Sequence, residues 1–155
     1  MIIRRFLPDD AEEVSKMIAK TLREVNIKDY TRQYIENFIQ KIQAENIIER
    51  ASWTHFYVVL DENKIIGSGA IGSYWDYEDE SCLFTIFVQP EYHGKGIGKK
   101  IIETLEQDEY FLRAKRIEIA SSITAVPFYL KMGYRFKDGI RKVDDELLIR
   151  LEKLR

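Results

Sequence analysis

The residues whose types and spacing best suit chemistry are three glycines at alternate positions, Gly94, Gly96 and Gly98, within residues 93–100. Glycines remove side chains where the backbone must come close to a ligand. The start of a following helix leaves several N–H groups without intrahelical partners and carries the positive end of the helix dipole. Three lysines in the same segment add positive charge. The segment predicts a phosphate-binding turn; the alternative is a tight loop whose glycines serve only packing.

Two familiar phosphate-binding patterns do not fit this segment. The Walker pattern, begun at Gly94, requires a glycine where Lys99 stands. The dinucleotide pattern G-x-G-x-x-G meets Lys99 when it begins at Gly94, and Ile101 when it begins at Gly96. Both patterns are therefore excluded, while an unrelated nucleotide- or phosphate-binding domain remains an alternative.

A second segment, residues 125–136, begins a predicted helix with Phe128 and Tyr129 side by side. It matches the pattern A-x-x-F-Y-x-x-x-G-F/Y, and the glycine turn matches Q/R-x-x-G-x-G/A except that His93 stands where Gln or Arg is usual. With both patterns in this order, the chain resembles the GNAT superfamily of N-acetyltransferases. The resemblance covers about residues 55–151, while the helical region 11–50 is weakly diagnostic.

This resemblance implies an enzyme that moves an acetyl group from acetyl-CoA directly to a primary amine, without a covalent enzyme intermediate or a metal. In the family, the tyrosine that matches Tyr129 lies near the coenzyme A sulfur and is the general acid, because a neutral phenol can protonate a departing thiolate. The pantetheine arm is expected beside the central strand at Ile86, Phe87 and Val88. The Val88 N–H is expected to stabilise the oxyanion.

The resemblance also assigns the other cofactor contacts. The diphosphate is expected on the backbone N–H groups of His93, Gly94, Lys95, Gly96, Ile97, Gly98 and Lys99. Ser122 occupies a place where family members often carry Asn, and its hydroxyl can make one such contact. Alternatively, Ser122 caps the next helix, a role for which Thr124 competes.

The general base is the point at which this sequence departs from the family. Family members often carry Glu near the positions of Cys82 and Phe84, and neither of these residues can take a proton in that role. The nearest carboxylates lie in residues 74–80, and Glu80 is the first candidate because it lies closest to the strand; alternatively, the amine arrives already neutral. That segment also holds three aromatic residues, so it is either a cation-attracting wall for the amine or a solvated hairpin loop.

These residues need a sheet and helices to position them. Alternating or continuous apolar runs predict strands over 2–6, 55–60, 64–71, 83–88, 116–120, 134–136 and 146–151. Helices are predicted after a capping box of Asp10 and Glu13, after Thr31, and over 97–105 and 125–132. The fold class is α/β (α+β mixed), with a mostly antiparallel twisted sheet of about six to seven strands and helices on both faces. The resemblance adds a splay at the central strand, where acetyl-CoA binds.

Composition limits the class of protein. The 155 residues suit one domain over 1–155, and the single Cys82 is expected to be a small buried residue. A net charge of −2 excludes the basic surface of a general nucleic-acid binder. No apolar run approaches the roughly 20 residues of a membrane span. We expect a cytoplasmic enzyme with a small-molecule or peptide amine substrate and no nucleic-acid or membrane partner. The sequence leaves the oligomeric state open, although homodimers are common in the family. The alternative is a non-catalytic CoA-binding sensor or interaction module of the same fold.

Overall fold

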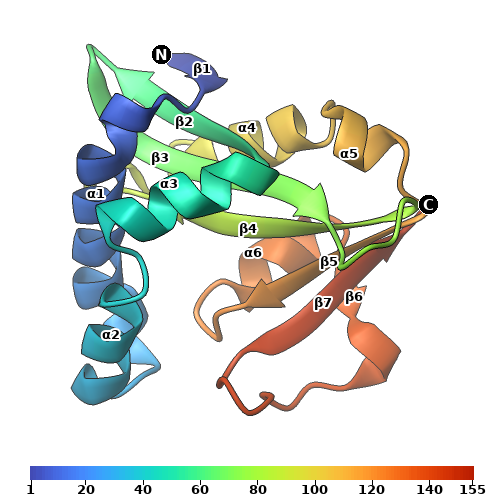
Figure 1. Ribbon diagram of the computed structural model, residues 1–155. Coiled ribbons are helices and arrows are strands. Elements are labelled where there is room, and N and C mark those ends of the chain that lie inside the picture. The colour runs from blue at the N-terminus through green and yellow to red at the C-terminus, as the bar shows by residue number, and fades with distance from the viewer.

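Seven strands form one sheet in the computed structural model, which describes residues 1–155 (Figure 1). Their order is β1-β2-β3-β4-β5-β7-β6, and β4 and β5 in the middle are the single parallel pair. The strands are β1 Ile2–Arg5, β2 His55–Asp61, β3 Lys64–Ser73, β4 Glu80–Val88, β5 Arg116–Ser121, β6 Arg135–Phe136 and β7 Ile149–Leu154. The predicted mixed and mostly antiparallel sheet is confirmed.

Helices cover both faces of this sheet (Figure 1). One face carries α1 Ala11–Glu24, α2 Arg32–Ile39 and α3 Ala44–Trp53, and the other carries α4 Ile97–Leu105, α5 Glu109–Leu112 and α6 Val126–Lys131. Because successive strand residues point to opposite faces, Val58 belongs to the core under α1–α3 and Val59 to the core under α4–α6. None of the helices is long and apolar enough to cross a membrane.

A β-bulge in β4 divides the middle of the sheet. Opposite Gly69 of β3, β4 has two residues, Thr85 and Ile86. Thr85 has a φ of 55°, and its carbonyl accepts a hydrogen bond from Ser68 Oγ at 2.8 Å. A bulge of this kind bends the strand that carries it. β4 pairs with β5 only over residues 80–83, so residues 84–88 have no strand neighbour on the β5 side, and the predicted splay is confirmed.

The first half of the chain holds one helix more than the sequence predicted. As predicted, Thr31 caps α2, since its Oγ1 accepts a hydrogen bond from the Tyr34 amide at 3.1 Å. The additional helix is α3, which follows α2 and leads into β2. Only Ile47 of α3 is fully buried, and so short an apolar face gives little periodic signal in the sequence.

The predicted capping box at the start of α1 is wrong. The Asp10 carboxylate makes no bond to the helix end; it accepts from the Leu7 amide at 2.7 Å and pairs with Arg4 of β1 at 2.8 Å. The Glu13 carboxylate accepts from the Ile65 amide of β3 at 2.7 Å. These two carboxylates therefore tie α1 to the sheet instead of closing its first turn.

The last strand lies later in the chain than predicted. Asp144 Oδ1 accepts from the amides of Glu146 and Leu148 at 2.9 and 3.1 Å, which holds the predicted strand start in a turn. β7 begins at Ile149 and continues to Leu154, where it pairs with Arg116 of β5. A side-chain acceptor that engages nearby amides competes with strand pairing in this way.

Candidate active site

The glycine turn before α4 presents a row of unused backbone donors. The amides of residues 94–99 donate no hydrogen bond within the chain, whereas the Lys100 amide donates to the Gly96 carbonyl at 3.1 Å. Gly94 and Gly96 have φ of 77° and 79°, a conformation that side-chain-bearing residues rarely adopt. The His93 amide is already engaged, because it donates to the Pro90 carbonyl at 3.1 Å. Of the amides predicted to bind the diphosphate, that of His93 is therefore not free, whereas those of residues 94–99 are.

The two motifs found in the sequence meet in space. Gly98 lies in the first turn of α4, and a Cβ atom there would lie 3.1 Å from the ring of Phe128 in α6. A methyl group at this position would be tighter than ordinary van der Waals contact, so the Phe128 ring or one of the helices would have to shift by a few tenths of an ångström. Packing against Phe128, rather than backbone conformation, therefore accounts for the third glycine of the turn.

Val88 ends β4 with its polar backbone groups directed into the splay. The next residue, Gln89, donates its amide to the Ile66 carbonyl of β3 at 2.8 Å. Since hydrogen bonding alternates along an antiparallel strand, the N–H and C=O of Val88 point away from β3 toward the open side. The His93 ring nitrogen Nε2 donates to the Val88 carbonyl at 2.7 Å, which ties the glycine turn to the strand end. The Val88 N–H is left for a ligand.

Tyr129 lies in the core under α4–α6 and has an unpaired hydroxyl. Its side chain is 5% exposed and packs in the same cluster as Ile97 and Ile101 of α4, with Val88 at the edge of that cluster. Its hydroxyl makes no hydrogen bond within the chain, and it is not among the fully enclosed unpaired atoms, so a ligand can reach it. Burial raises the pKa of Tyr129, which keeps the phenol protonated at neutral pH.

Ser122 caps the turn that leads into α6, although the N-cap of the helix itself is Ala125, which has no side-chain cap. The Ser122 Oγ accepts from the Ala125 amide at 3.2 Å in the turn before α6. Thr124, the competing residue, donates its hydroxyl to Asp29 Oδ2 at 2.7 Å. The Ser122 hydroxyl keeps its own proton for a second partner, so the capping bond and a cofactor contact are compatible.

The structure does not bring Glu80 to the other site residues. Glu80 begins β4 and Val88 ends it, a separation of roughly 25 Å along an extended strand. Its carboxylate accepts from Arg116 Nε at 3.0 Å, where β4 and β5 are still paired. Glu80 thus forms part of the closed end of the sheet, and nothing in its contacts fits a proton acceptor at the splay.

The acidic and aromatic segment before β4 lies at that same closed end. The Tyr74 ring already faces two cations of the chain, Arg116 at 4.8 Å and Lys137 at 5.6 Å from its centroid. Trp75 and Tyr77 are 78% and 54% exposed. These contacts fit the solvated hairpin loop better than the predicted wall for an amine.

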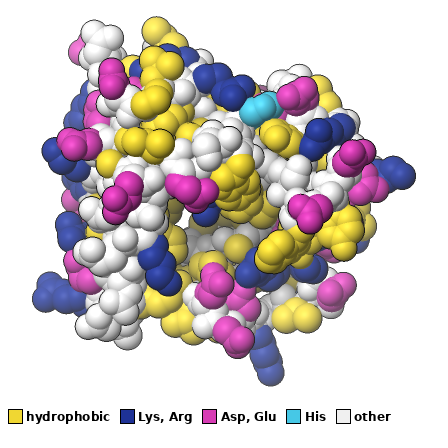
Figure 2. Space-filling model, viewed as in Figure 1, with side chains coloured by type: hydrophobic (Ala, Val, Ile, Leu, Met, Phe, Trp, Pro, Cys, Tyr) yellow, Lys and Arg dark blue, Asp and Glu magenta, His cyan; other side chains and the backbone are white.

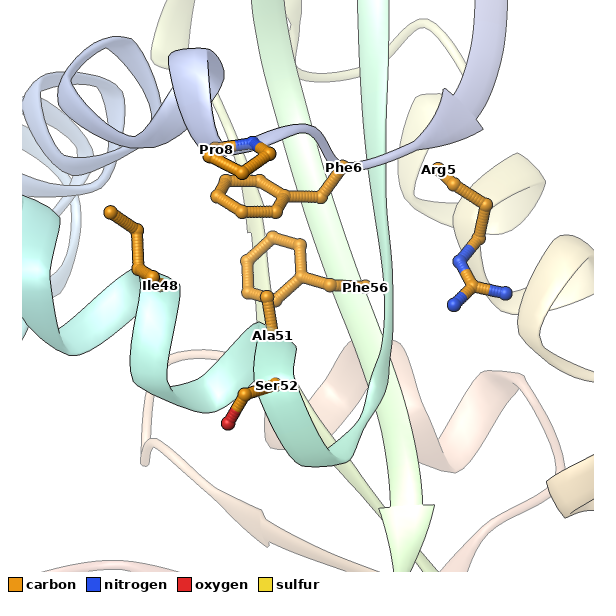
Figure 3. A pocket seen from close by; sticks show the side chains of 7 residues that line it. All are labelled: Arg5, Phe6, Pro8, Ile48, Ala51, Ser52 and Phe56. Atoms are coloured by element: carbon orange, nitrogen blue, oxygen red, sulfur yellow. The ribbon is translucent and has the colours of Figure 1, made fainter.

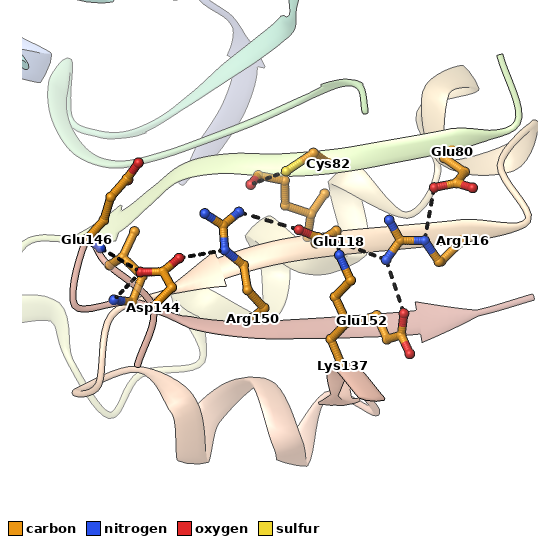
Figure 4. Close-up of polar contacts among 11 residues, drawn as sticks. Glu80, Cys82, Arg116, Glu118, Lys137, Asp144, Glu146, Arg150 and Glu152 are labelled. Carbon is orange, nitrogen blue, oxygen red and sulfur yellow. Dashed lines mark hydrogen bonds and ion pairs between the residues drawn. The ribbon is translucent and has the colours of Figure 1, made fainter. Parts of the chain in front are cut away.

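A network of charged side chains covers the β5–β7 half of the sheet on the face opposite α4 and α6 (Figure 4). At its centre Glu118, 1% exposed, contacts Lys137 at 2.8 Å, Arg116 at 2.9 Å and Arg150 at 3.4 Å. Burial alone would raise the pKa of Glu118, but the hydrogen bonds from these cations lower it overall. This network was not predicted from the sequence, although the alternating charges of residues 116–118 and 150–152 on two strands were its signal.

Cys82 lies beside this network, opposite Glu118 in the register of β4 and β5. The thiol is buried, as predicted. Burial and the nearby Glu118 carboxylate raise the pKa of Cys82 to about 12. At neutral pH it is therefore a protonated thiol, which is a poor nucleophile.

A hollow opens on the face that carries α1–α3, between α2 and α3 on one side and the β5–β7 half of the sheet on the other (Figure 2). One border is closed by hydrogen bonds from α2 and the turn that precedes it to the loop before β7. Tyr30 Oη donates to the Leu147 carbonyl at 2.8 Å and Tyr34 Oη donates to the Glu146 carbonyl at 2.6 Å. The hollow thus lies across the sheet from Tyr129 and the glycine turn.

A separate pocket of about 260 Å³ lies on the outer side of α3, between α3 and the segment that follows β1 (Figure 3). Its walls are mostly apolar, including Phe6, Ile48 and Phe56. The one hydroxyl there, Ser52 Oγ, donates to the Glu49 carbonyl at 2.6 Å. This pocket carries no group suited to acyl transfer.

Comparisons with known proteins agree with the geometry. Residues 26–153 match the sequence model of the acetyltransferase (GNAT) domain family. A curated relative, the spermine/spermidine N(1)-acetyltransferase of Bacillus subtilis (strain 168), is 23% identical over 128 residues, which cover 74% of this chain and 84% of the relative. The crystal structure of PaiA N-acetyltransferase from Thermoplasma acidophilum in complex with coenzyme A superposes with a TM-score of 0.82 at 20% identity, covering 99% of this chain and 98% of that one. An aminoglycoside 6'-N-acetyltransferase complexed with coenzyme A gives a TM-score of 0.70 at 16% identity, covering 99% of this chain and 97% of that one.

Proposed function

The chain belongs to the GNAT acetyltransferase family, and from this premise we propose that it transfers an acetyl group from acetyl-CoA to a primary amine. The observation that carries the proposal is the row of unused amides over residues 94–99, which lies beside the open end of β4. Amides at a helix start, with three lysines nearby, suit the diphosphate of a CoA thioester.

The splay supplies the rest of the cofactor site in this proposal. The pantetheine arm lies along residues 86–88, which have no strand neighbour on the β5 side, and pairs with backbone there. The Val88 N–H donates to the thioester oxygen as negative charge develops on it. Ser122 gives one further contact through its free hydroxyl proton.

Tyr129 is proposed as the general acid. The amine nitrogen attacks the thioester carbon, the C–N bond forms, the C–S bond breaks, and the thiolate takes the Tyr129 hydroxyl proton. Burial raises the pKa of Tyr129, which keeps the phenol protonated until the thiolate forms. The phenol recovers its proton from solvent, and the amide nitrogen loses its proton to solvent.

The amine is proposed to react as the neutral base. Glu80, the candidate from the sequence, lies at the far end of β4 and is paired with Arg116. An amine that arrives neutral needs no carboxylate at the splay, and its proton is lost to water before it reaches the thioester. The rate is therefore expected to follow the fraction of free amine in solution.

The acceptor class is open to a direct test. The curated relatives are named for acetylation of spermine and spermidine, which makes small amines the first substrates to assay. The purified protein is mixed with acetyl-CoA and a panel of polyamines, amino acids and aminoglycosides, and free thiol release is followed. Release that depends on an amine supports the enzyme; tight binding of acetyl-CoA without turnover of any amine supports a non-catalytic CoA-binding module instead.

A further inference from the structure

Arg50 of α3 is a partly buried cation that lacks a carboxylate partner. Its single hydrogen bond within the chain runs from Nη1 to Thr85 Oγ1 at 3.2 Å, and no ion pair involves it. Its Nε is fully enclosed and has no partner at all. The neighbouring Glu49 is engaged elsewhere, because it accepts from Trp53 Nε1 at 2.8 Å. Burying a charge without a counter-charge is costly, and a bound anion would relieve that cost.

Two aromatic rings hold the Arg50 guanidinium in place. Its Cζ lies 4.5 Å from the centroid of Phe84 and 5.3 Å from that of Trp53. The rings pack edge to face, with their centroids 5.1 Å apart. Nη2 has no partner in the chain and is not enclosed, so its donors remain available to a ligand. The side chain is thus oriented before anything binds.

Arg50 lies next to the segment of β4 that is proposed to hold pantetheine. Thr85, its hydrogen-bond partner, is a bulge residue in the part of β4 that has already left β5, and it directly precedes the residues proposed to hold pantetheine. Arg50 reaches Thr85 from α3, on the face that carries the hollow, whereas Tyr129 packs under α4–α6. An acceptor that approaches the splay from this face would therefore find the Arg50 guanidinium beside Thr85.

We propose that Arg50 binds a carboxylate of the acceptor, and that the substrates are amines carrying a carboxylate, such as amino acids. This inference rests on the proposed acetyl transfer. A single guanidinium with free donors matches a monoanion, and planar carboxylates suit its fork geometry. The arginines of β5 and β7 on this face, Arg116 and Arg150, are already paired with Glu118. A polyamine would place its own cation beside Arg50 and be repelled.

The test compares three matched acceptors, L-phenylalanine, L-phenylalaninamide and phenethylamine, at equal concentrations of free amine, and extends to the other amino acids with their amides. The wild type is expected to give the acid a kcat/KM at least about 10-fold above the amide, as a charge-assisted hydrogen bond predicts. Arg50→Met, which keeps packing on the rings, is expected to remove that preference, and Arg50→Lys to restore part of it. A wild type that prefers the amides, or an Arg50→Met variant that slows all acceptors equally, would overturn the proposal.

The control is Arg113→Met. Arg113 also lies over an aromatic ring, 4.5 Å from the Tyr110 centroid, but it is exposed at the end of α5. Its loss is expected to leave the preference for the acid unchanged.

A binding measurement separates this inference from the proposed function. Calorimetry with N-acetyl-L-amino acids and CoA-loaded protein requires no turnover. Binding that Arg50→Met weakens by about 10-fold or more supports the carboxylate site even if no amine is acetylated. Equal binding by the wild type and the variant would contradict the carboxylate site even if acetyl transfer is confirmed.

Discussion

A Cβ atom on Gly98 would lie 3.1 Å from two carbons of the Phe128 ring. Gly98 comes from the glycine turn and Phe128 from the helix that carries Tyr129, so this contact sets the spacing between the proposed diphosphate site and the proposed acid. Positions in such close contact tolerate no added methyl group without movement of one helix or the other.

Gly98→Ala is accordingly expected to weaken CoA binding about 10-fold and to lower stability by about 1–3 kcal/mol, the usual cost of overpacking. Isothermal calorimetry and thermal unfolding measure the two effects. Phe128→Leu in the same chain makes room for the methyl group and should restore part of the affinity. Full affinity in Gly98→Ala alone would mean that α4 and α6 move apart freely.

Tyr129→Phe is expected to lower kcat by about 10²–10⁴ while CoA binding stays nearly unchanged, because the hydroxyl is unpaired and its loss removes only the proton donor. Steady-state kinetics and calorimetry measure both quantities. The matched control is Tyr134→Phe, whose ring lies 6.2 Å from that of Tyr129 in the same core. A normal kcat in Tyr129→Phe would show that the thiolate leaves without this acid.

Glu80→Gln is expected to keep acetyl transfer within about 3-fold of the wild type, because Glu80 lies at the far end of β4 from the proposed site. Loss of its partly exposed ion pair with Arg116 should cost roughly 1 kcal/mol of stability or less. The pH profile is the sharper readout. With a neutral amine as the reactant, kcat/KM should rise tenfold per pH unit below the pKa of the amine in both proteins. If the wild-type pH profile rises with the pKa of a carboxyl group, and this rise is absent in Glu80→Gln, then Glu80 is the general base.

The raised pKa of Cys82 is expected to make the folded protein less stable above pH 9. Its pKa rises on folding from an ordinary 9.0 to about 12, so its contribution is complete below pH 9 and is lost as the pH rises toward 12. The loss amounts to about 1.4 kcal/mol per pH unit in this window. Urea unfolding of the wild type and Cys82→Ala between pH 8 and 11 isolates this effect from the titration of tyrosines. An equal fall in unfolding free energy with pH for the wild type and Cys82→Ala would contradict the raised pKa of Cys82.

Glu118→Gln is expected to destabilise the protein by about 1–3 kcal/mol, because Lys137 loses its carboxylate partner while Arg116 and Arg150 keep Glu152 and Asp144. Chemical denaturation measures this, with the exposed Glu12→Gln as control. Since folding lowers the pKa of Glu118, the stability it contributes should be present above its ordinary pKa of 4.5 and fall as the pH drops further.

Much of this fold was predictable because its signals are local. The apolar runs of β2, β3 and β4, the helical spacing of Ile97, Ile101 and Leu105, and the glycine turn each depend on residues close in sequence. The start of α1 was not predictable, since the Glu13 carboxylate bonds to Ile65, a strand residue far along the chain, and the Asp10 carboxylate pairs with Arg4 of β1 instead of the helix end.

The site was predictable only in part for the same reason. The glycine turn and Tyr129 belong to short motifs, whereas the placement of Glu80 depends on which end of β4 pairs with β5. Arg50 carries no motif. Its significance arises from contacts with Thr85 and Phe84, which only the folded chain brings to α3.

The proposed function depends above all on the backbone amides of residues 94–99 holding the diphosphate of a CoA thioester. An NMR titration of ¹⁵N-labelled protein with coenzyme A, and separately with pantetheine, observes these amides directly. The account predicts that coenzyme A shifts the resonances of Gly94, Gly96 and Gly98 strongly, and that pantetheine, which lacks the diphosphate, leaves them nearly unchanged. Tight binding of coenzyme A with these resonances unmoved would contradict it.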